Sequence, residues 1–180
     1  MLTLLLSFLL FPQESIGYKF WENFSIEEKQ LVLKNPDVPL EILNILNAEN
    51  APSPDSERTI QVLEILSSNP KNEGIRALYF YLFNRWFYRS DGELGELVSP
   101  YCLRMIMNHL DFILSYFSIQ PSIMEWYANH IGYELGMDDC YIEAFNRFKQ
   151  KLGAVKISDN NIATRKKFFE LVDYTIKSVI

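Results

Sequence analysis

Helix-capping residues constrain the fold of this chain more than any other feature of its sequence. Five short polar residues each stand directly before a run of apolar residues with helical spacing, namely Ser25, Asp37, Ser56, Ser99 and Asp139. Such side chains accept hydrogen bonds from the free N–H groups in the first turn of a helix. The repeated pattern therefore predicts an all-α fold.

The apolar spacing after these caps predicts seven or eight helices. We expect them at residues 26–34, 37–47, 57–68, 75–88, 99–118, 121–136 and 139–153, and from residue 161 toward the C-terminus. Gly153 is expected to end its helix in the left-handed conformation. The clearest apolar stripe, which we expect to be buried, is Leu103, Ile106, Leu110, Leu114 and Phe117.

A single domain over residues 16–180 accommodates these helices. A chain of 180 residues fits within one domain and can bury one sizeable core. We therefore expect an irregular helical bundle or a short array of helical hairpins. The aromatic-rich segment 18–24 is expected to fasten the N-terminal arm to this body through its rings.

One short segment resembles a known repeat. Residues 33–43 (LKNPDVPLEIL) resemble the Asn-Pro-x-x-Pro-x-x-Leu core of variant leucine-rich repeats, which are helical solenoid units. A second Asn-Pro pair, at Asn69-Pro70, lacks the following proline, and a third copy is missing. The resemblance implies paired antiparallel helices in this part of the chain and does not extend over the whole chain.

Residues 1–15 allow two interpretations. The segment Met1–Phe11 (MLTLLLSFLLF) has the length of the apolar region of an export signal, followed by turn-forming residues. It lacks a preceding Lys or Arg and a good cleavage pattern, so a packed N-terminal element is the alternative. We favour export, to the periplasm or the extracellular space, over a cytoplasmic location.

The two cysteines do not decide the compartment. Cys102 and Cys140 are too few for a disulfide framework. Each lies near the start of an expected helix, where a small buried apolar residue is the common role. We therefore expect them to be unpaired.

Charge and hydropathy restrict the partners. The net charge of −6 opposes binding to nucleic acid or anionic lipid, because the field of the whole protein repels phosphate groups. No stretch reaches the roughly 18 to 20 apolar residues that span a bilayer. We expect neither nucleic acid binding nor a stable transmembrane span.

An aromatic segment provides the candidate binding surface. Residues 79–89 contain large rings interleaved with cations, and the candidate partner or ligand surface is Tyr81, Arg85, Trp86, Tyr88 and Arg89. In an acidic all-α domain most aromatic residues of such a helix belong to the core. The alternative is that the segment forms a protein-binding groove, which we favour over a nucleic acid surface.

The sequence contains one weak metal-ligand pattern. His130 and Glu134 are spaced i,i+4 and share a helix face, with Asp138 or Asp139 as a third candidate ligand. No HExxH motif and no cysteine pair accompany them. We therefore interpret His130 and Glu134 as an ordinary surface pair and predict no metal, no cofactor and no catalytic residue.

These features together favour a non-catalytic protein-binding module, either an adaptor or a small acidic inhibitor of the immunity-protein type. The first alternative is a protein that binds an apolar small ligand between its helices, along residues 79–86. The second is a metal-dependent enzyme that uses the face of His130 and Glu134.

Overall fold

Helices account for most of the chain that the structure describes. The structure is a computed structural model that describes residues 17–48, 57–90 and 92–179. Within these ranges it contains no β-strand, so the predicted all-α class and number of helices are confirmed. The α-helices are α1 (Ile26–Leu33), α2 (Leu40–Leu46), α3 (Glu57–Leu66), α4 (Glu73–Phe87), α5 (Gly92–Ile119), α6 (Pro121–Gly136), α7 (Tyr141–Gly153) and α8 (Ile162–Val179), with short 3-10 helices at Trp21–Asn23 and Asp159–Asn161.

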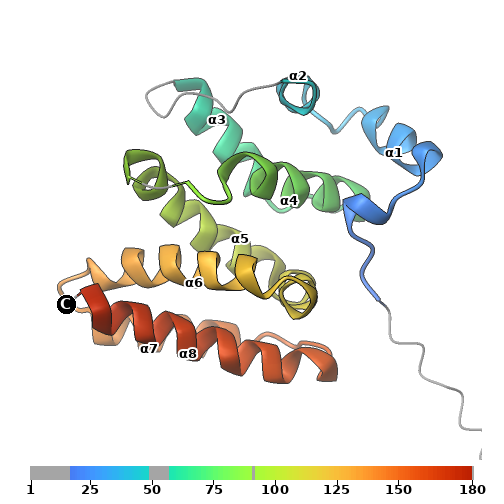
Figure 1. Ribbon diagram of the computed structural model, residues 1–180. Helices are drawn as coiled ribbons and strands as arrows, with labels where there is room; N and C mark the ends of the chain where they lie inside the picture. The colour runs from blue at the N-terminus through green and yellow to red at the C-terminus, as the bar shows by residue number, and fades with distance from the viewer. Residues whose placement is uncertain (1–16, 49–56, 91, 180) are drawn as a thin grey trace, which may run out of the picture.

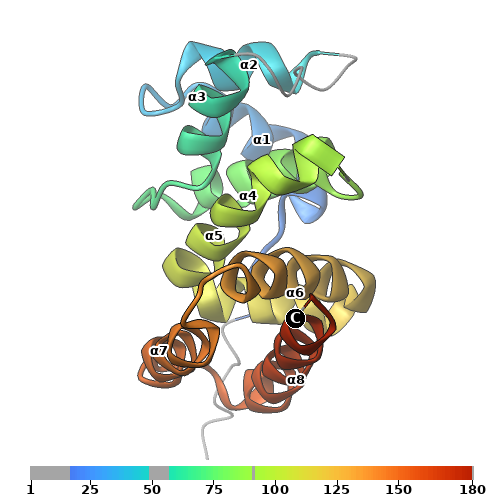
Figure 2. The same ribbon diagram turned by 90° about the vertical axis from the view of Figure 1, so that its left-hand side faces the viewer.

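The long helix α5 connects two groups of helices. Helices α1 to α4 lie at one end of the molecule and α6 to α8 at the other, and α5 runs between them in both views (Figures 1 and 2). The backbone of α5 is interrupted at His109, which has non-helical dihedral angles (φ −135°, ψ 33°). The imidazole Nε2 of His109 lies 2.9 Å from the carbonyl oxygen of Ser68, just after α3. The kinked helix therefore contacts the N-terminal group as well as α6.

Two glycines bring α6 and α8 into close contact. A Cβ atom on Gly132 would lie 2.5 Å from Cβ of Thr175 and 3.1 Å from the carbonyl oxygen of Val172. One turn later, a Cβ on Gly136 would lie 2.6 Å from the side chain of Val179. Because no side chain separates the two backbones, the helices approach more closely than larger residues would allow.

Aromatic rings join α4, α5 and the N-terminal arm. The ring of Phe80 lies 5.3 Å from Phe112 and 4.9 Å from Tyr116. On the other side of these α5 rings, Phe20 lies 5.1 Å from Phe112. The arm also buries Trp21, so the prediction that its rings fasten it to the body is confirmed.

Most of the predicted apolar stripe on α5 is buried. Ile106, Leu110, Leu114 and Phe117 belong to the core, whereas Leu103 is half-buried at its edge. The apolar spacing also predicts buried sides for α2, with Leu40 and Ile42, and for α3, with Ile60 and Leu63. Ile42 and Leu63 are buried, whereas Leu40 and Ile60 are exposed, because these short helices bury only one side.

Of four predicted helix starts, those at Ser25 and Pro121 are confirmed and those at Asp37 and Asp139 are wrong. Ser25 forms a complete capping box with Glu28, as expected. Asp37 does not begin a helix, because its N–H donates to Oδ1 of Asn35 in a turn (2.9 Å) and α2 begins only after Pro39. Asp139 is replaced by Asp138, whose Oδ1 accepts the N–H of Cys140 (2.8 Å) before α7. The start of α6 at Pro121 agrees with the prediction.

Ser99 is the largest error among the caps. The helix begins at Gly92, seven residues earlier, and continues through Pro100. The hydroxyl of Ser99 donates back to the carbonyl oxygen of Gly95 (3.0 Å), as a serine inside a helix does. Residues 92–98, which we expected to form a loop, are therefore the first two turns of α5.

Gly153 and the cysteines complete the comparison. Gly153 does not adopt a positive φ, and the helix ends at Ala154 in the right-handed region. Cys102 and Cys140 are both free, as expected, but only Cys102 is buried. Cys140 is exposed because it stands at the start of α7 outside the core.

The predictions for residues 1–15 and for Ser56 lie outside the described residues. Within the described ranges, none of the helices combines the length and the apolar character that crossing a membrane requires. The choice between an export signal and a packed element therefore stays a prediction.

Candidate functional site

The five residues of the predicted aromatic surface contact different parts of the molecule. Tyr81 is half-buried with its ring 6.4 Å from that of Trp21 in the arm. Arg85 donates to the carbonyl oxygen of Leu46 at the end of α2 (3.0 Å). The guanidinium of Arg85 also lies 4.9 Å from the ring of Trp86.

The other two members of this set lie at the end of α4. The ring of Tyr88 packs edge-on against Trp126 of α6 (5.9 Å). The guanidinium of Arg89 lies 5.3 Å from the ring of Tyr88. Tyr81, Arg85 and Tyr88 thus pack against the arm, α2 and α6, whereas Trp86 and Arg89 contact their neighbours Arg85 and Tyr88. Their role in binding a partner stays a prediction.

His130 and Glu134 do not form the surface pair that we expected. The ring of His130 turns toward α5, where its Nδ1 lies 2.9 Å from Oγ of Ser99. No ion pair joins the two side chains in the part of the chain that the structure describes. The physical reason is packing, since the first turns of α5 cover this face of α6.

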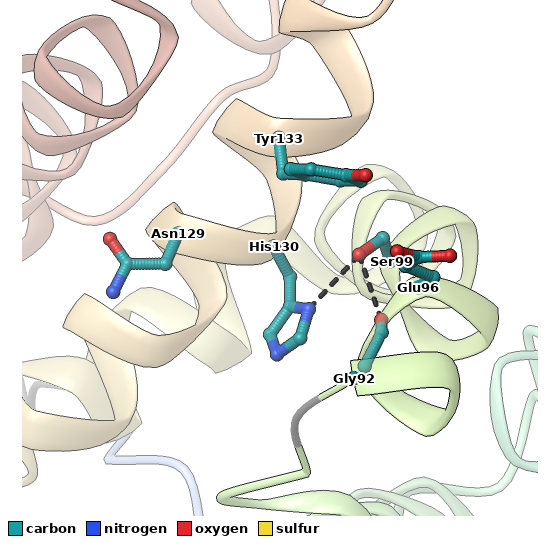
Figure 3. Close-up of a pocket in the computed structure, with 7 residues that line it drawn as sticks. Gly92, Glu96, Ser99, Asn129, His130 and Tyr133 are labelled. Atoms are coloured by element: carbon teal, nitrogen blue, oxygen red, sulfur yellow. Dashed lines mark hydrogen bonds between the residues drawn. The ribbon is translucent and has the colours of Figure 1, made fainter. Parts of the chain in front are cut away.

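A pocket opens where these two helices meet. It has a volume of about 250 Å³, and its lining residues come from the first two turns of α5 and the middle of α6: Gly92, Gly95, Glu96, Ser99, Asn129, His130 and Tyr133. In Figure 3 the ring of Tyr133 extends over the α5 side, where Glu96 and Ser99 lie, and the ring of His130 points toward Ser99. The amide of Asn129 points away from Ser99.

Hydrogen bonds hold the polar groups on the inner side of this pocket. Ser99 is only 1% exposed, and its hydroxyl donates to the carbonyl oxygen of Gly95. Nδ1 of His130 lies 2.9 Å from Oγ of Ser99, and the imidazole also lies near the carbonyl groups of Gly95 and Ser90. On the other side, Oδ1 of Asn129 accepts from the hydroxyl of Thr175 on α8 (3.0 Å).

Burial shifts the titration of two groups on this face. The pKa of His130 is lowered by burial, an effect that the nearby carbonyl groups of Gly95 and Ser90 oppose. The pKa of the Glu134 carboxyl is raised, also by burial. His130 is therefore neutral near pH 7 and brings no positive charge to the pocket.

Two glycines allow the helices to approach at this point. A Cβ atom on Gly95 would lie 3.2 Å from Cε1 of His130, so a larger residue would press against the imidazole. Gly92 has a φ of +51°, a left-handed conformation that suits glycine at the start of α5. A Cβ at Gly92 would meet no atom within 4 Å, since this residue faces the open side of the pocket.

Among the lining residues, only His130 was a candidate ligand from the sequence, and Ser99 was expected to be a helix cap. Gly92, Gly95 and Ser99 follow at intervals of three and four, so they form one narrow face of small residues on a helix. That spacing was the signal for a close contact, but the glycines indicated a loop instead. Glu96 and Tyr133 carry no signal of their own in the sequence.

The composition of the site limits its chemistry. Among the described residues, no three His, Cys, Asp or Glu side chains lie close enough together to hold a metal ion.

Comparisons of this chain with models of protein families, with curated proteins and with solved structures found no match. The function has to be inferred from the pocket itself.

Proposed function

We propose that this protein is a non-catalytic protein-binding module that receives a side chain of its partner in the pocket between α5 and α6. The observation that carries the proposal is the size and construction of this pocket. Its volume of about 250 Å³ falls below the range of about 300 to 1,000 Å³ that is usual for small-molecule sites. A pocket of this size suits one anchoring side chain of a protein partner.

The pocket is also held in one shape before any partner arrives. Its walls are two packed helices, and hydrogen bonds fix both Ser99 and His130. A preformed pocket lowers the cost of ordering side chains on association. The open side, in contrast, presents the exposed carboxylate of Glu96 and the ring of Tyr133.

A hydrolytic role for the Ser99–His130 pair fits this geometry poorly. A nucleophilic serine needs access to substrate and a base that accepts its proton. Ser99 is buried, and its proton is directed at the carbonyl oxygen of Gly95. The pair therefore supports the wall of the pocket. The metal-dependent alternative has little support, because His130 and Glu134 belong to no group of three candidate ligands among the described residues.

The apolar-ligand alternative has less support along α4. Residues 79–86 contribute rings that already pack against other rings, such as Phe83 against Tyr127 at 6.0 Å. Phe80 and Phe83 are both buried. A ligand would have to displace these contacts, whereas the pocket between α5 and α6 is open.

Site-specific photo-crosslinking tests the proposal. The photoreactive residue p-benzoylphenylalanine replaces Tyr133 in the pocket or, as a matched control, Tyr174 on α8. Tyr174 is exposed and directly precedes Thr175, the residue that donates to Asn129. We expect one protein to be crosslinked from position 133 and not from position 174 in cells that express the chain. The purified partner should then bind the purified protein, and more weakly after Tyr133→Ala. Crosslinks that are the same from both positions, or none from position 133, would contradict the proposal.

A further inference from the structure

The charges around the pocket indicate what kind of side chain it receives. Glu96 lines the pocket and forms no ion pair within the described ranges. Glu93 lies one turn before it on α5, and Glu134 lies one turn after His130 on α6. Neither of these two carboxylates has a cationic partner in the described part of the chain either.

The remaining lining groups add no positive charge. Among the described residues, the lining contains no lysine or arginine. His130 is neutral near pH 7, because burial lowers its pKa. Tyr133 contributes an aromatic face, which attracts cations through its quadrupole. The pocket therefore combines an aromatic ring with a carboxylate that has no ion pair among the described residues, and both groups favour a cation.

We propose that the pocket binds an arginine side chain of the partner protein. This proposal rests on the protein-binding function proposed above and specifies its chemistry. A planar guanidinium can stack on the ring of Tyr133 while it donates two hydrogen bonds to the carboxylate of Glu96. A lysine ammonium can make the ion pair but does not offer the same planar, paired donors. The net charge of −6 adds a field that draws basic partners toward this surface.

An NMR titration with small probes tests this chemistry without the partner. The full chain is titrated with N-acetyl-arginine amide and, separately, with N-acetyl-citrulline amide, which has nearly the same shape but no charge. We expect arginine to shift the amide resonances of Gly92, Gly95 and Glu96 with a dissociation constant in the millimolar range. Citrulline should shift them far less at the same concentration. N-acetyl-lysine amide should bind, but more weakly than arginine.

Two variants with matched chemistry locate the interaction. Glu96→Gln should weaken arginine binding by up to about fivefold, the factor that corresponds to the upper end for an exposed ion pair. Glu41→Gln, at an exposed position on α2, makes the same change elsewhere and should leave binding unaltered. Tyr133→Leu keeps an apolar side chain but removes the ring, and should also weaken binding. Both glutamates are exposed, so the spectra of the variants should confirm an intact fold.

The outcomes separate this inference from the proposed function. Equal shifts with citrulline and arginine, no shifts in the pocket, or equal effects of the two glutamine variants would overturn arginine recognition. If Tyr133 crosslinks one partner while arginine fails in any of these ways, the protein-binding function stands and only the chemistry proposed for the pocket is wrong. If arginine binds as expected and no partner is crosslinked, the pocket recognises the cation and the protein-binding function is contradicted.

Discussion

The ring and the hydroxyl group of Tyr127 have opposite effects on the stability of the core. The residue is fully buried on α6, and its ring lies 5.3 Å from Phe117 and 6.0 Å from Phe83. Its hydroxyl is buried and has no hydrogen-bond partner among the described residues. Burial also raises the pKa of this hydroxyl well above its ordinary value. The ring therefore stabilises the core while the hydroxyl loses its contacts with water.

Replacing Tyr127 with phenylalanine should stabilise the protein. The change removes the unpaired hydroxyl and keeps the ring, so we expect a gain of about 1 kcal/mol in the free energy of unfolding. The matched control is Tyr116→Phe, because the Tyr116 hydroxyl donates to Glu22 (3.1 Å) and its removal should cost about 0.5 to 1.5 kcal/mol. Urea denaturation measures both, and a loss of stability in Tyr127→Phe would show that the hydroxyl has a partner.

Ser99 offers a second test at the same scale. In Ser99→Ala, Nδ1 of His130 loses its buried hydrogen-bond partner. We therefore expect the free energy of unfolding to fall by about 1 to 3 kcal/mol. Nitrogen-15 NMR of the imidazole should also show a change in the balance of its two neutral tautomers. Ser118→Ala, an exposed position with a bond only to the carbonyl oxygen of Ser115, should change neither property appreciably. An unchanged tautomer in Ser99→Ala would contradict the assigned hydrogen bond.

At the scale of elements, the sequence predicts helices better than it predicts where they begin. Ser25 was identified correctly because Glu28 completes a reciprocal pair within four residues. Ser99 before Pro100 also has the local appearance of a helix start, yet the helix begins at Gly92. Packing against His130 stabilises glycine-containing turns whose intrinsic helix propensity is low. Such contacts join residues that are distant in the chain, so local patterns could not reveal them.

The contact between α6 and α8 gives a prediction with opposite signs at two glycines. Gly132→Ala should destabilise the protein by about 1 to 2 kcal/mol, because the new methyl group would press against Thr175 and the backbone of Val172. Gly153→Ala places the same methyl group in open space at the end of α7, and should stabilise by up to about 1 kcal/mol. Thermal or urea unfolding of both variants checks this. A stabilising Gly132→Ala would mean that the two helices can separate at little cost.

At the scale of the whole molecule, the candidate site depends on how distant segments meet. The pocket joins residues 92–99 to residues 129–133, and neither segment has a recognisable motif. The fold class could be predicted because each helix carries its own apolar spacing. The site could not, since it depends on the geometry of two helices and on the gap that Gly92 and Gly95 leave between them.

Asp111 connects three distant parts of the chain. Its carboxylate accepts hydrogen bonds from the Tyr18 hydroxyl in the arm (3.0 Å), from the N–H of Ser158 (2.9 Å) and from Nδ2 of Asn161 (2.7 Å). Burial raises the pKa of Asp111, but the hydrogen bonds from Asn161, Ser158 and Tyr18 outweigh it, so the pKa is lowered overall. The ionised carboxylate therefore holds the arm, α5 and the start of α8 together.

This arrangement predicts an acid-dependent loss of stability. A carboxyl group with a lowered pKa in the folded state stabilises the fold fully above its unfolded pKa of about 4, and the contribution is lost as the pH falls toward the folded value. Asp111→Asn cannot ionise and keeps one acceptor oxygen, so we expect it to be less stable than the natural protein by about 1 to 3 kcal/mol at pH 7. The difference should shrink as the pH falls below about 4.

Urea unfolding at a series of pH values measures this difference directly. Asp173→Asn is a suitable control, because that carboxylate pairs only with Lys177 at an exposed position on α8 and should contribute less than about 1 kcal/mol. Tyr18→Phe should lose part of the Asp111 effect, since it removes one of the groups that donate to the Asp111 carboxylate. If Asp111→Asn differed from the natural protein by the same amount at pH 3 and at pH 7, the ionised carboxylate would not be the group that joins these segments. Other contacts would then hold the arm on α5, such as its rings against Phe112 and Tyr116 and the hydrogen bond from Tyr116 to Glu22.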